Sequence, residues 1–180
     1  PRNMTEAAGM YATLLEGDEP ALVVECLNGY RSKENMPSNL GEYRTPIGIA
    51  EVVKEGTDLT LLSYGSTFNI CQAAAKELEA MGISVELVDA RTLLPFDTTN
   101  VSLQSLKKTN RLLIVDEDVP GGASGYLLND VLHRQGGYQY LDAAPVTLTA
   151  KPHLPAYGTD GDYFSKPSIE EVIDTVLGII

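Results

Sequence analysis

Three consecutive carboxylates are the first residues in this sequence whose types and spacing could do chemistry. Asp116, Glu117 and Asp118 directly follow the apolar residues 112–115, which lie in a predicted β-strand at 111–116. Open α/β sheets bind ligands at the carboxyl ends of their strands, and carboxylates there can transfer protons or bind a hard cation. A solvated loop, or carboxylate partners for an arginine across an interface, explains the same residues and is the favoured interpretation.

Two glycine-containing turns follow predicted strands and precede predicted helices, at residues 65–67 and 121–125. Backbone N–H groups at a helix start can hold an anion. The second turn matches neither the dinucleotide-binding Gly-x-Gly-x-x-Gly spacing nor a P-loop. We therefore favour an ordinary helix start capped by Ser66 or Thr67 at the first turn, and close helix packing at the second.

Histidines and cysteines add no recognisable site. His133 and His153 have no nucleophile or metal-ligand partner at a familiar spacing. Cys26 and Cys71 lie in apolar patterns and are interpreted as buried thiols of a reducing cytosol. Taken alone, the residues show no chemistry of their own.

The stretch from residue 58 to 97 contains the clearest structural pattern. Residues 58–64 and 84–89 are short apolar runs that predict strands, and the segment between them has helical periodicity. The apolar face of this helix is predicted to carry Cys71, Ala74, Leu78 and Met81, and Gly82 fits its end. Two strands joined by a helix form a βαβ unit, which implies a parallel sheet.

The rest of the chain continues the alternation of strands and helices. The sequence predicts an edge strand at 49–53, a helix within 98–109, a strand at 111–116, a helix after 121–125, a strand at 145–149, a loop rich in Pro and Tyr at 152–163, and a final helix that starts at Ser168. The fold class is therefore α/β, with an open, mostly parallel sheet that has helices on both faces.

The N-terminal part is expected to belong to a different body. Asn3 and Glu6 resemble a capping box, a helix follows as far as Gly17, and residues 21–26 predict a strand. Residues 28–46 have linker composition. Because the chain starts at Pro1 and this piece cannot bury two faces, we expect a fragment in which 1–45 is the tail of an upstream domain plus a linker, and 46–180 is the second domain.

Charge and hydropathy exclude two classes of partner. With 13 basic and 25 acidic residues the net charge is −12, which argues against a nucleic-acid surface. No apolar run reaches the length of about 18 residues that a membrane span requires. The expected location is cytoplasmic.

Three motifs stand out along the chain: Glu55-Gly-Thr-Asp-Leu-Thr-Leu, Val88-Asp-Ala-Arg-Thr-Leu-Leu-Pro-Phe-Asp97 and Lys107-Lys-Thr-Asn-Arg-Leu. Together with shorter matches at 1–2, 20–25, 30–31, 121–122 and 144–146, they resemble the β subunit of thiamine diphosphate-dependent 2-oxo acid dehydrogenases of the pyruvate and branched-chain (2-oxoisovalerate) type. The resemblance implies that 46–180 is a transketolase-type C-terminal domain and that 1–45 ends a pyrimidine-binding domain.

The resemblance also implies an activity that this segment does not complete. The full enzyme would be an oxidoreductase that decarboxylates a 2-oxo acid and acylates a lipoyl domain of a dihydrolipoyl acyltransferase. Its thiamine diphosphate and magnesium would be held by residues outside this sequence, so no catalytic or cofactor-binding residue is expected here. The fragment alone is expected to be inactive, and its role to be assembly.

One metal site of the family reaches into the N-terminal helix. The resemblance implies a structural potassium ion held by backbone carbonyls, which by position are those of Leu14, Gly17 and Glu19. Gly17 and Glu19 depart from the Asp and Asn often found there, and the other ligands would lie before Pro1.

The resemblance implies as partners the α and remaining β portions of the enzyme, in a homodimer or heterotetramer, and the acyltransferase, docked at the apolar C-terminus 177–180. The favoured interpretation of 177–180 itself is a last helix that packs on its own sheet. Two alternatives stay open. One is the C-terminal domain of a transketolase or deoxyxylulose-phosphate synthase. The other is a free-standing α/β module that binds a small anion at 65–67 or 121–125.

Overall fold

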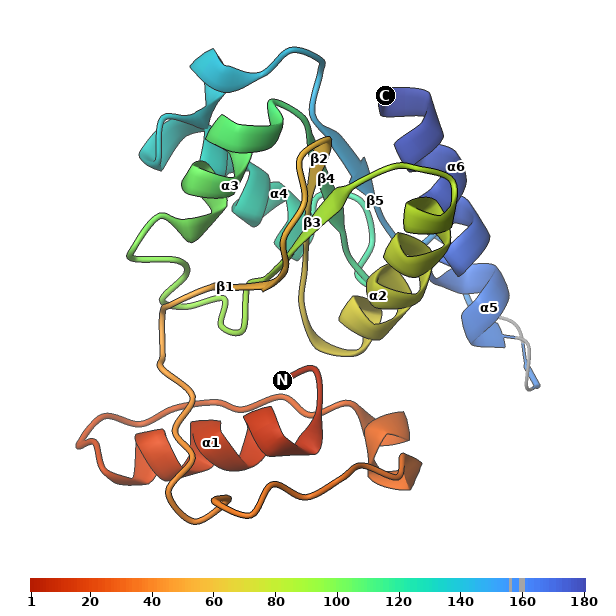
Figure 1. Ribbon diagram of the computed structural model, residues 1–180. Helices are drawn as coiled ribbons and strands as arrows, with labels where there is room; N and C mark the ends of the chain where they lie inside the picture. The colour runs from red at the N-terminus through yellow and green to blue at the C-terminus, as the bar shows by residue number, and fades with distance from the viewer. Residues whose placement is uncertain (156, 159–160) are drawn as a thin grey trace.

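A five-stranded sheet forms the centre of the computed structural model, which describes residues 1–155, 157–158 and 161–180 (Figure 1). The strand order is β1-β3-β2-β4-β5, and every pair is parallel except β1 with β3. The strands are β1 (Glu51–Lys54), β2 (Leu59–Ser63), β3 (Val85–Asp89), β4 (Leu112–Val115) and β5 (Val146–Leu148). The predicted fold class is confirmed, with the expected edge strand as β1.

Helices cover both faces of the sheet (Figure 1). The α-helices are α1 (Met4–Leu15), α2 (Gly65–Ala80), α3 (Val101–Thr109), α4 (Ala123–Asn129), α5 (Gly161–Ser165) and α6 (Ile169–Ile179). Shorter turns are the 3₁₀ helices η1 (Leu27–Arg31) and η3 (Gly137–Tyr140) and the π-helical turn η2 (Asp130–Arg134), which continues α4. No described helix has the length and apolar character needed to cross a membrane.

Two separate hydrophobic clusters hold these layers together. Every residue of β2, β3 and β4 is buried, because each of these strands has neighbours on both sides and helices on both faces. One cluster joins α2 and α6 to one face, and its largest side chain is Phe68. The other joins α3 and α4 to the opposite face, around Leu106 and Leu127. No residue of segment 1–45 belongs to either cluster.

The central βαβ unit forms as predicted, with two differences in α2. The helix begins at Gly65 after Tyr64, without a side-chain cap, so the predicted cap by Ser66 or Thr67 is wrong. The Ser66 hydroxyl instead donates to Glu117. Met81 is 57% exposed, because the helix ends before this residue can reach the sheet. Gly82 has φ +86°, the left-handed conformation expected at the helix end.

The N-terminal helix forms, but the strand predicted after it does not. The Asn3 side chain accepts the N–H of Glu6 and caps α1. Residues 21–26 are irregular, and Leu22 and Val24 are 89% and 73% exposed. The prediction is wrong for this chain because no described strand lies beside the segment, and a lone extended run has no ladder to join.

The final helix α6 has a complete capping box. Ser168 Oγ accepts the Glu171 N–H, and the Glu171 carboxylate accepts the Ser168 N–H. The predicted loop before it includes residues 156 and 159–160, which lie outside the described residues.

Removing this cap should loosen the end of the domain measurably. We expect Ser168→Ala to lower the free energy of unfolding by about 1 kcal/mol, because one helix N–H loses its acceptor. Urea unfolding of the variant beside Thr175→Ser, which keeps a hydroxyl within α6, measures the effect. Equal stability of Ser168→Ala and the unaltered chain would contradict it.

Candidate functional site

Five charged residues meet where segment 1–45 contacts the sheet, and we call this group the charged junction: Arg2, Glu6, Glu51, Asp89 and Arg91. Arg2 Nη1 lies 2.5 Å from Asp89 Oδ2, and Arg2 Nη2 lies 2.8 Å from Glu51 Oε2. Arg91 Nη2 lies 2.6 Å from the same Glu51 oxygen and 3.4 Å from Glu6 Oε1. Arg2, which precedes α1, therefore pairs with β1 and β3, and Arg91, which follows β3, pairs with α1 and β1.

The sheet and its exit turn position one half of the junction. Glu51 opens β1 and pairs in register with Asp89 at the carboxyl end of β3. Arg91 follows two residues later at φ +58°, a left-handed backbone that turns its side chain back over the strand ends. The Asp89 carboxylate accepts the Arg91 N–H at 2.9 Å and so supports this turn.

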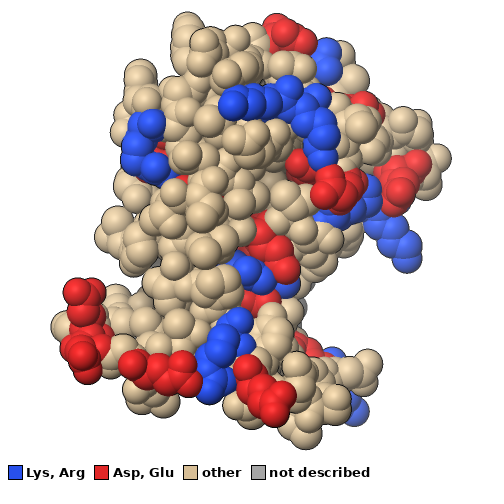
Figure 2. All heavy atoms as spheres, turned by 60° about the vertical axis from the view of Figure 1, so that its left-hand side comes forward, with Lys and Arg blue, Asp and Glu red and all other residues tan. Residues whose placement is uncertain are grey.

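The N-terminal helix and the returning chain position the other half. Glu6 is buried in the first turn of α1, where Tyr43 Oη donates to it at 2.7 Å and Thr45 Oγ1 at 3.1 Å. The Arg2 guanidinium also lies 5.6 Å from the ring centroid of Phe68 in α2. Figure 2 shows basic and acidic side chains together at the waist between the N-terminal segment and the sheet domain.

The electrostatics of the junction are those of partly desolvated charges. Burial raises the pKa of the Asp89 carboxyl, and the hydrogen bond and charge of Arg2 oppose that rise only in part. Arg91 Nε and Glu51 Oε2 are buried without a hydrogen-bond partner among the described residues, although Glu51 Oε2 lies at ion-pair distance from both arginines. Ion pairs and hydrogen bonds therefore hold the group together, since Arg2 donates to Asp89 while Tyr43 and Thr45 donate to Glu6.

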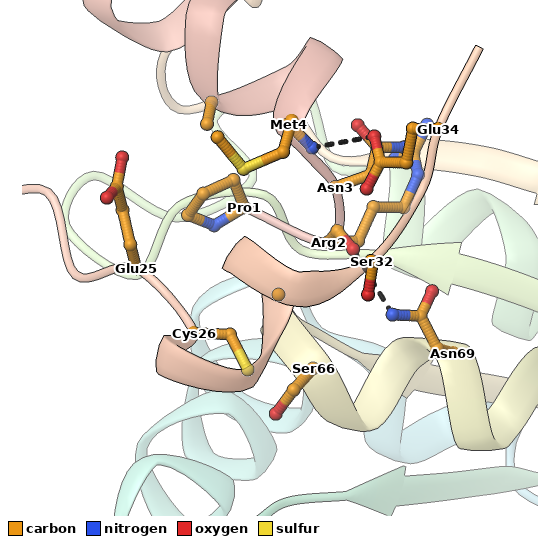
Figure 3. Close-up of a pocket in the computed structure, with 12 residues that line it drawn as sticks. Pro1, Arg2, Asn3, Met4, Glu25, Cys26, Ser32, Glu34, Ser66 and Asn69 are labelled. Atoms are coloured by element: carbon orange, nitrogen blue, oxygen red, sulfur yellow. Dashed lines mark hydrogen bonds between the residues drawn. The ribbon is translucent and has the colours of Figure 1, made fainter.

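Two cavities flank the first turn of α2. One, of about 180 Å³, lies between the N-terminus and α2 (Figure 3). At its rim the Met4 N–H donates to Glu34, and the Asn69 side chain donates to the Arg2 carbonyl. The other, of about 330 Å³, lies between the start of α2 and the α5–α6 turn, where Glu117, Tyr163 and Lys166 line it. Both are open, mixed polar and apolar pockets at contacts between segments.

The three consecutive carboxylates have structural partners. Asp116 is fully buried and accepts Tyr64 Oη at 2.6 Å, the Ser124 N–H at 2.7 Å and the Asp118 N–H at 3.0 Å. Burial raises the pKa of the Tyr64 hydroxyl, so it stays a donor to this carboxylate. These contacts fix the carboxyl end of β4 to α4, as a structural group rather than a set of cation ligands.

Glu117 and the residues of the two glycine turns also have hydrogen-bond or ion-pair partners within the chain. The Glu117 carboxylate accepts Ser66 Oγ at 2.9 Å and Lys166 Nζ at 3.1 Å. In the first turn of α4, the Ser124 N–H donates to the Asp116 carboxylate. Because a carboxylate of the protein already lies at each helix start, these turns favour the interpretation as ordinary helix starts over anion binding.

The remaining sequence-predicted residues do not converge on the junction. Leu14, Gly17 and Glu19 lie in the turn after α1, where the Leu14 carbonyl accepts the Gly17 N–H at 3.1 Å. His153 lies on the surface, 3.1 Å from Ser165 Oγ, and His133 lies in η2. Across the described part of the chain, no group of three or more His, Cys, Asp or Glu side chains is arranged to hold a metal ion.

The two thiols should differ sharply in reactivity. Cys71 is fully buried in α2, and this burial raises its pKa to about 12, whereas Cys26 is partly exposed between the two cavities. We expect Ellman's reagent at pH 8 to modify one thiol in the native chain and two after denaturation. Cys26→Ser is the control and should abolish the native reaction, and rapid native modification of two thiols would contradict the structure.

Sequence reasoning missed the charged junction. Its members lie far apart in the chain. Arg2, Asp89 and Arg91 are parts of the resembling motifs and Glu6 is part of the expected capping box, but no local pattern relates these residues to one another. One signal was available, since Asp89 ends a strand that is otherwise suited to complete burial. A carboxylate in that position needs a cationic partner, but the sequence does not say which arginine supplies it.

Comparisons with known proteins place the chain in a family. The family model "Transketolase, C-terminal domain" matches residues 48–164. The Pyruvate dehydrogenase E1 component subunit beta of Rhizobium meliloti is 32% identical over 99% of this chain and 38% of that protein. The 2-oxoisovalerate dehydrogenase subunit beta of Bacillus subtilis is 32% identical over 87% of this chain and 46% of that protein.

A solved structure gives the same answer for the fold. It is named as a split gene transketolase, inactive beta4 tetramer, and aligns with a TM-score of 0.62 at 25% identity over 77% of this chain and 43% of that one. The chain thus spans less than half the length of the relatives it matches. The resemblance to dehydrogenase β subunits is confirmed, and the chain belongs to the transketolase C-terminal domain family.

Proposed function

We propose that the chain is the C-terminal assembly part of a β subunit in the decarboxylating component of a 2-oxo acid dehydrogenase. The observation that carries this proposal is the extent of the similarity, which continues beyond the family domain at 48–164 to 99% of the chain. If the chain shared only the family domain with these β subunits, we would expect the similarity to end near residues 48 and 164.

The complete enzyme, on this proposal, oxidatively decarboxylates a 2-oxo acid with thiamine diphosphate and magnesium, and transfers the acyl group to a lipoyl domain. Thiamine diphosphate would supply the carbanion chemistry. This chain offers no cluster of metal-binding side chains among its described residues, and its buried carboxylates already have partners. We assign it the tasks of binding and orienting the neighbouring parts.

We propose that residues 1–45 belong to a pyrimidine-binding domain and that 46–180 form the C-terminal domain. Two observations support this division. Neither hydrophobic cluster includes a residue of 1–45, and the strand-like run 21–26 exposes Leu22 and Val24 without a neighbouring strand. A sheet outside this chain would give that run the backbone partners it lacks.

The proposed partners are the α and remaining β portions, in a homodimer or heterotetramer, and a dihydrolipoyl acyltransferase. Leu177 and Ile180 near the C-terminus are 50% and 48% exposed, which supports docking of a partner there. Two free cysteines suit a reducing compartment, and we propose the cytoplasm.

We also propose that the carbonyls of Leu14, Gly17 and Glu19 bind potassium only together with oxygen ligands from outside this chain. Carbonyls in the turn after a helix are available to a hard cation. Here the Leu14 carbonyl already accepts the N–H groups of Glu16 and Gly17, and Gly17 and Glu19 are exposed. These residues alone do not form a complete site.

The rival within the same family is a transketolase. The split-gene relative of known structure supports it, because that protein also divides the enzyme between chains. The two activities differ in their substrates, a 2-oxo acid for one and a ketose phosphate for the other.

Reconstitution distinguishes the two. The chain is co-expressed with the portions of the enzyme that its relatives have and it lacks, and reduction of an artificial electron acceptor is measured with pyruvate and with 2-oxoisovalerate. We expect activity that requires thiamine diphosphate and disappears when the chain is omitted. An assembled complex that transfers a ketol group from a ketose phosphate and leaves both 2-oxo acids intact would overturn the proposal.

A further inference from the structure

Charged and polar side chains cross the contact between segment 1–45 and the sheet domain. No side chain of 1–45 joins either hydrophobic cluster, so the segment does not share the two cores of the domain. The contacts that cross between them include the charged junction, the Asn69 hydrogen bond to the Arg2 carbonyl, and the Arg2 guanidinium over the Phe68 ring. Such contacts are directional, whereas apolar contacts tolerate sliding.

The geometry points to an electrostatic lock: we propose that Arg2 and Arg91 together set the orientation of segment 1–45 on the carboxyl edge of the sheet. Each arginine forms ion pairs with two carboxylates, and at least one of these pairs joins segment 1–45 to the sheet domain. Arg2, from the segment, pairs with Glu51 and Asp89 of the sheet. Arg91, from the sheet exit, pairs with Glu6 of the segment and with Glu51.

Glu51 is the residue that joins the two arginines into one unit. Its Oε2 atom lies within 2.8 Å of both guanidinium groups, so the loss of either arginine leaves three carboxylates of the junction with a single cationic partner. Arg91 has only 9% of its side chain exposed, and Glu6 only 2%. Removing one partner of so buried a set leaves a desolvated charge, which is the costly outcome for buried ion pairs.

The left-handed backbone at Arg91 supports a positioning role. A non-glycine residue at φ +58° stores strain that neighbouring contacts must offset. Asp89 offsets it by accepting the Arg91 N–H, and the same carboxylate pairs with Arg2. The turn that aims Arg91 and the ion pair that holds Arg2 thus depend on one side chain.

The lock rests on contacts within this chain, so it stands or falls separately from the proposed enzyme activity. Its test measures orientation directly. Spin labels are placed at Leu15→Cys in α1 and Gln72→Cys in α2, both exposed, in a Cys26→Ser background. Cys71 is fully buried and does not take a label. The distance distribution between the labels then reports how segment 1–45 lies on the domain.

In this background we expect Arg91→Met to give a distribution roughly twofold wider, or one with a second maximum, because the segment samples other orientations. Arg44→Met is the matched control. It removes an arginine of the same segment whose pair with Glu16 is exposed, and the distribution should stay narrow.

Folding of the sheet is checked by amide protection in β2 and β3. If Arg91→Met fails to fold, Arg2→Met decides, because Arg2 lies outside the sheet and its removal leaves the Arg91 turn in place. A narrow, unshifted distribution in a folded Arg91→Met or Arg2→Met variant would overturn the lock.

Discussion

Replacing Phe68 with alanine should lower the free energy of unfolding by about 3–5 kcal/mol, the largest loss we expect from any single side chain. Phe68 is fully buried on α2 and belongs to the cluster that joins this helix and α6 to the sheet. The change removes its transfer free energy and leaves a cavity that a closely packed parallel sheet cannot close. Urea unfolding followed by circular dichroism measures the loss.

Met81 provides the matched control for this experiment. It belongs to the predicted apolar face of the same helix, but it is 57% exposed after the helix end. We expect Met81→Ala to change stability by less than about 0.5 kcal/mol, the usual range for surface substitutions. A loss for Met81→Ala equal to that for Phe68→Ala would mean that Met81 packs into the core, contrary to its observed exposure.

The second large effect concerns the carboxylate that starts α3. Asp97 is fully buried, and its two oxygens accept the Val101 N–H at 2.8 Å and the Ser102 N–H at 2.7 Å. Gln135 Nε2 donates to the same side chain at 3.3 Å. We expect Asp97→Asn to lower the free energy of unfolding by about 2–3 kcal/mol, because an amide NH₂ group then faces one of the helix N–H groups.

Asparagine is the informative substitution here. Asp97 has φ +39°, a conformation that asparagine adopts more readily than most residues, so the change tests the lost acceptor with little added backbone strain. Asp18→Asn, in the exposed turn after α1, is the control for the change in net charge. Equal stability of the Asp97 and Asp18 variants would show that the α3 start does not depend on this carboxylate.

Much of the fold follows from the sequence because its pattern and its packing agree. The apolar runs that became β2, β3 and β4 are short and bounded by turn residues, which is the pattern of strands buried on both faces. The capping residues Asn3 and Ser168 were also correctly predicted, since each acts within a few residues of itself.

Predictions failed where the outcome depends on distant neighbours. Residues 21–26 have the composition of a strand, but a strand needs a partner, and none of the described strands lies beside it. Ser66 could have capped α2, yet it donates to Glu117, which is 51 residues away in the sequence. The charged junction has the same character, because Arg2 and Asp89 are 87 residues apart. Local pattern carries no information on such pairs.

The central claim is that residues 46–180 provide an assembly interface, and the molar mass of the chain in solution tests it most directly. Light scattering across a concentration series, from high to low micromolar, separates self-association from aggregation. The account predicts a dimer that persists at low micromolar concentration, with exposed apolar side chains such as Leu177 and Ile180 available to partners. A chain that remains a monomer at every concentration would contradict the claim that this domain assembles by itself.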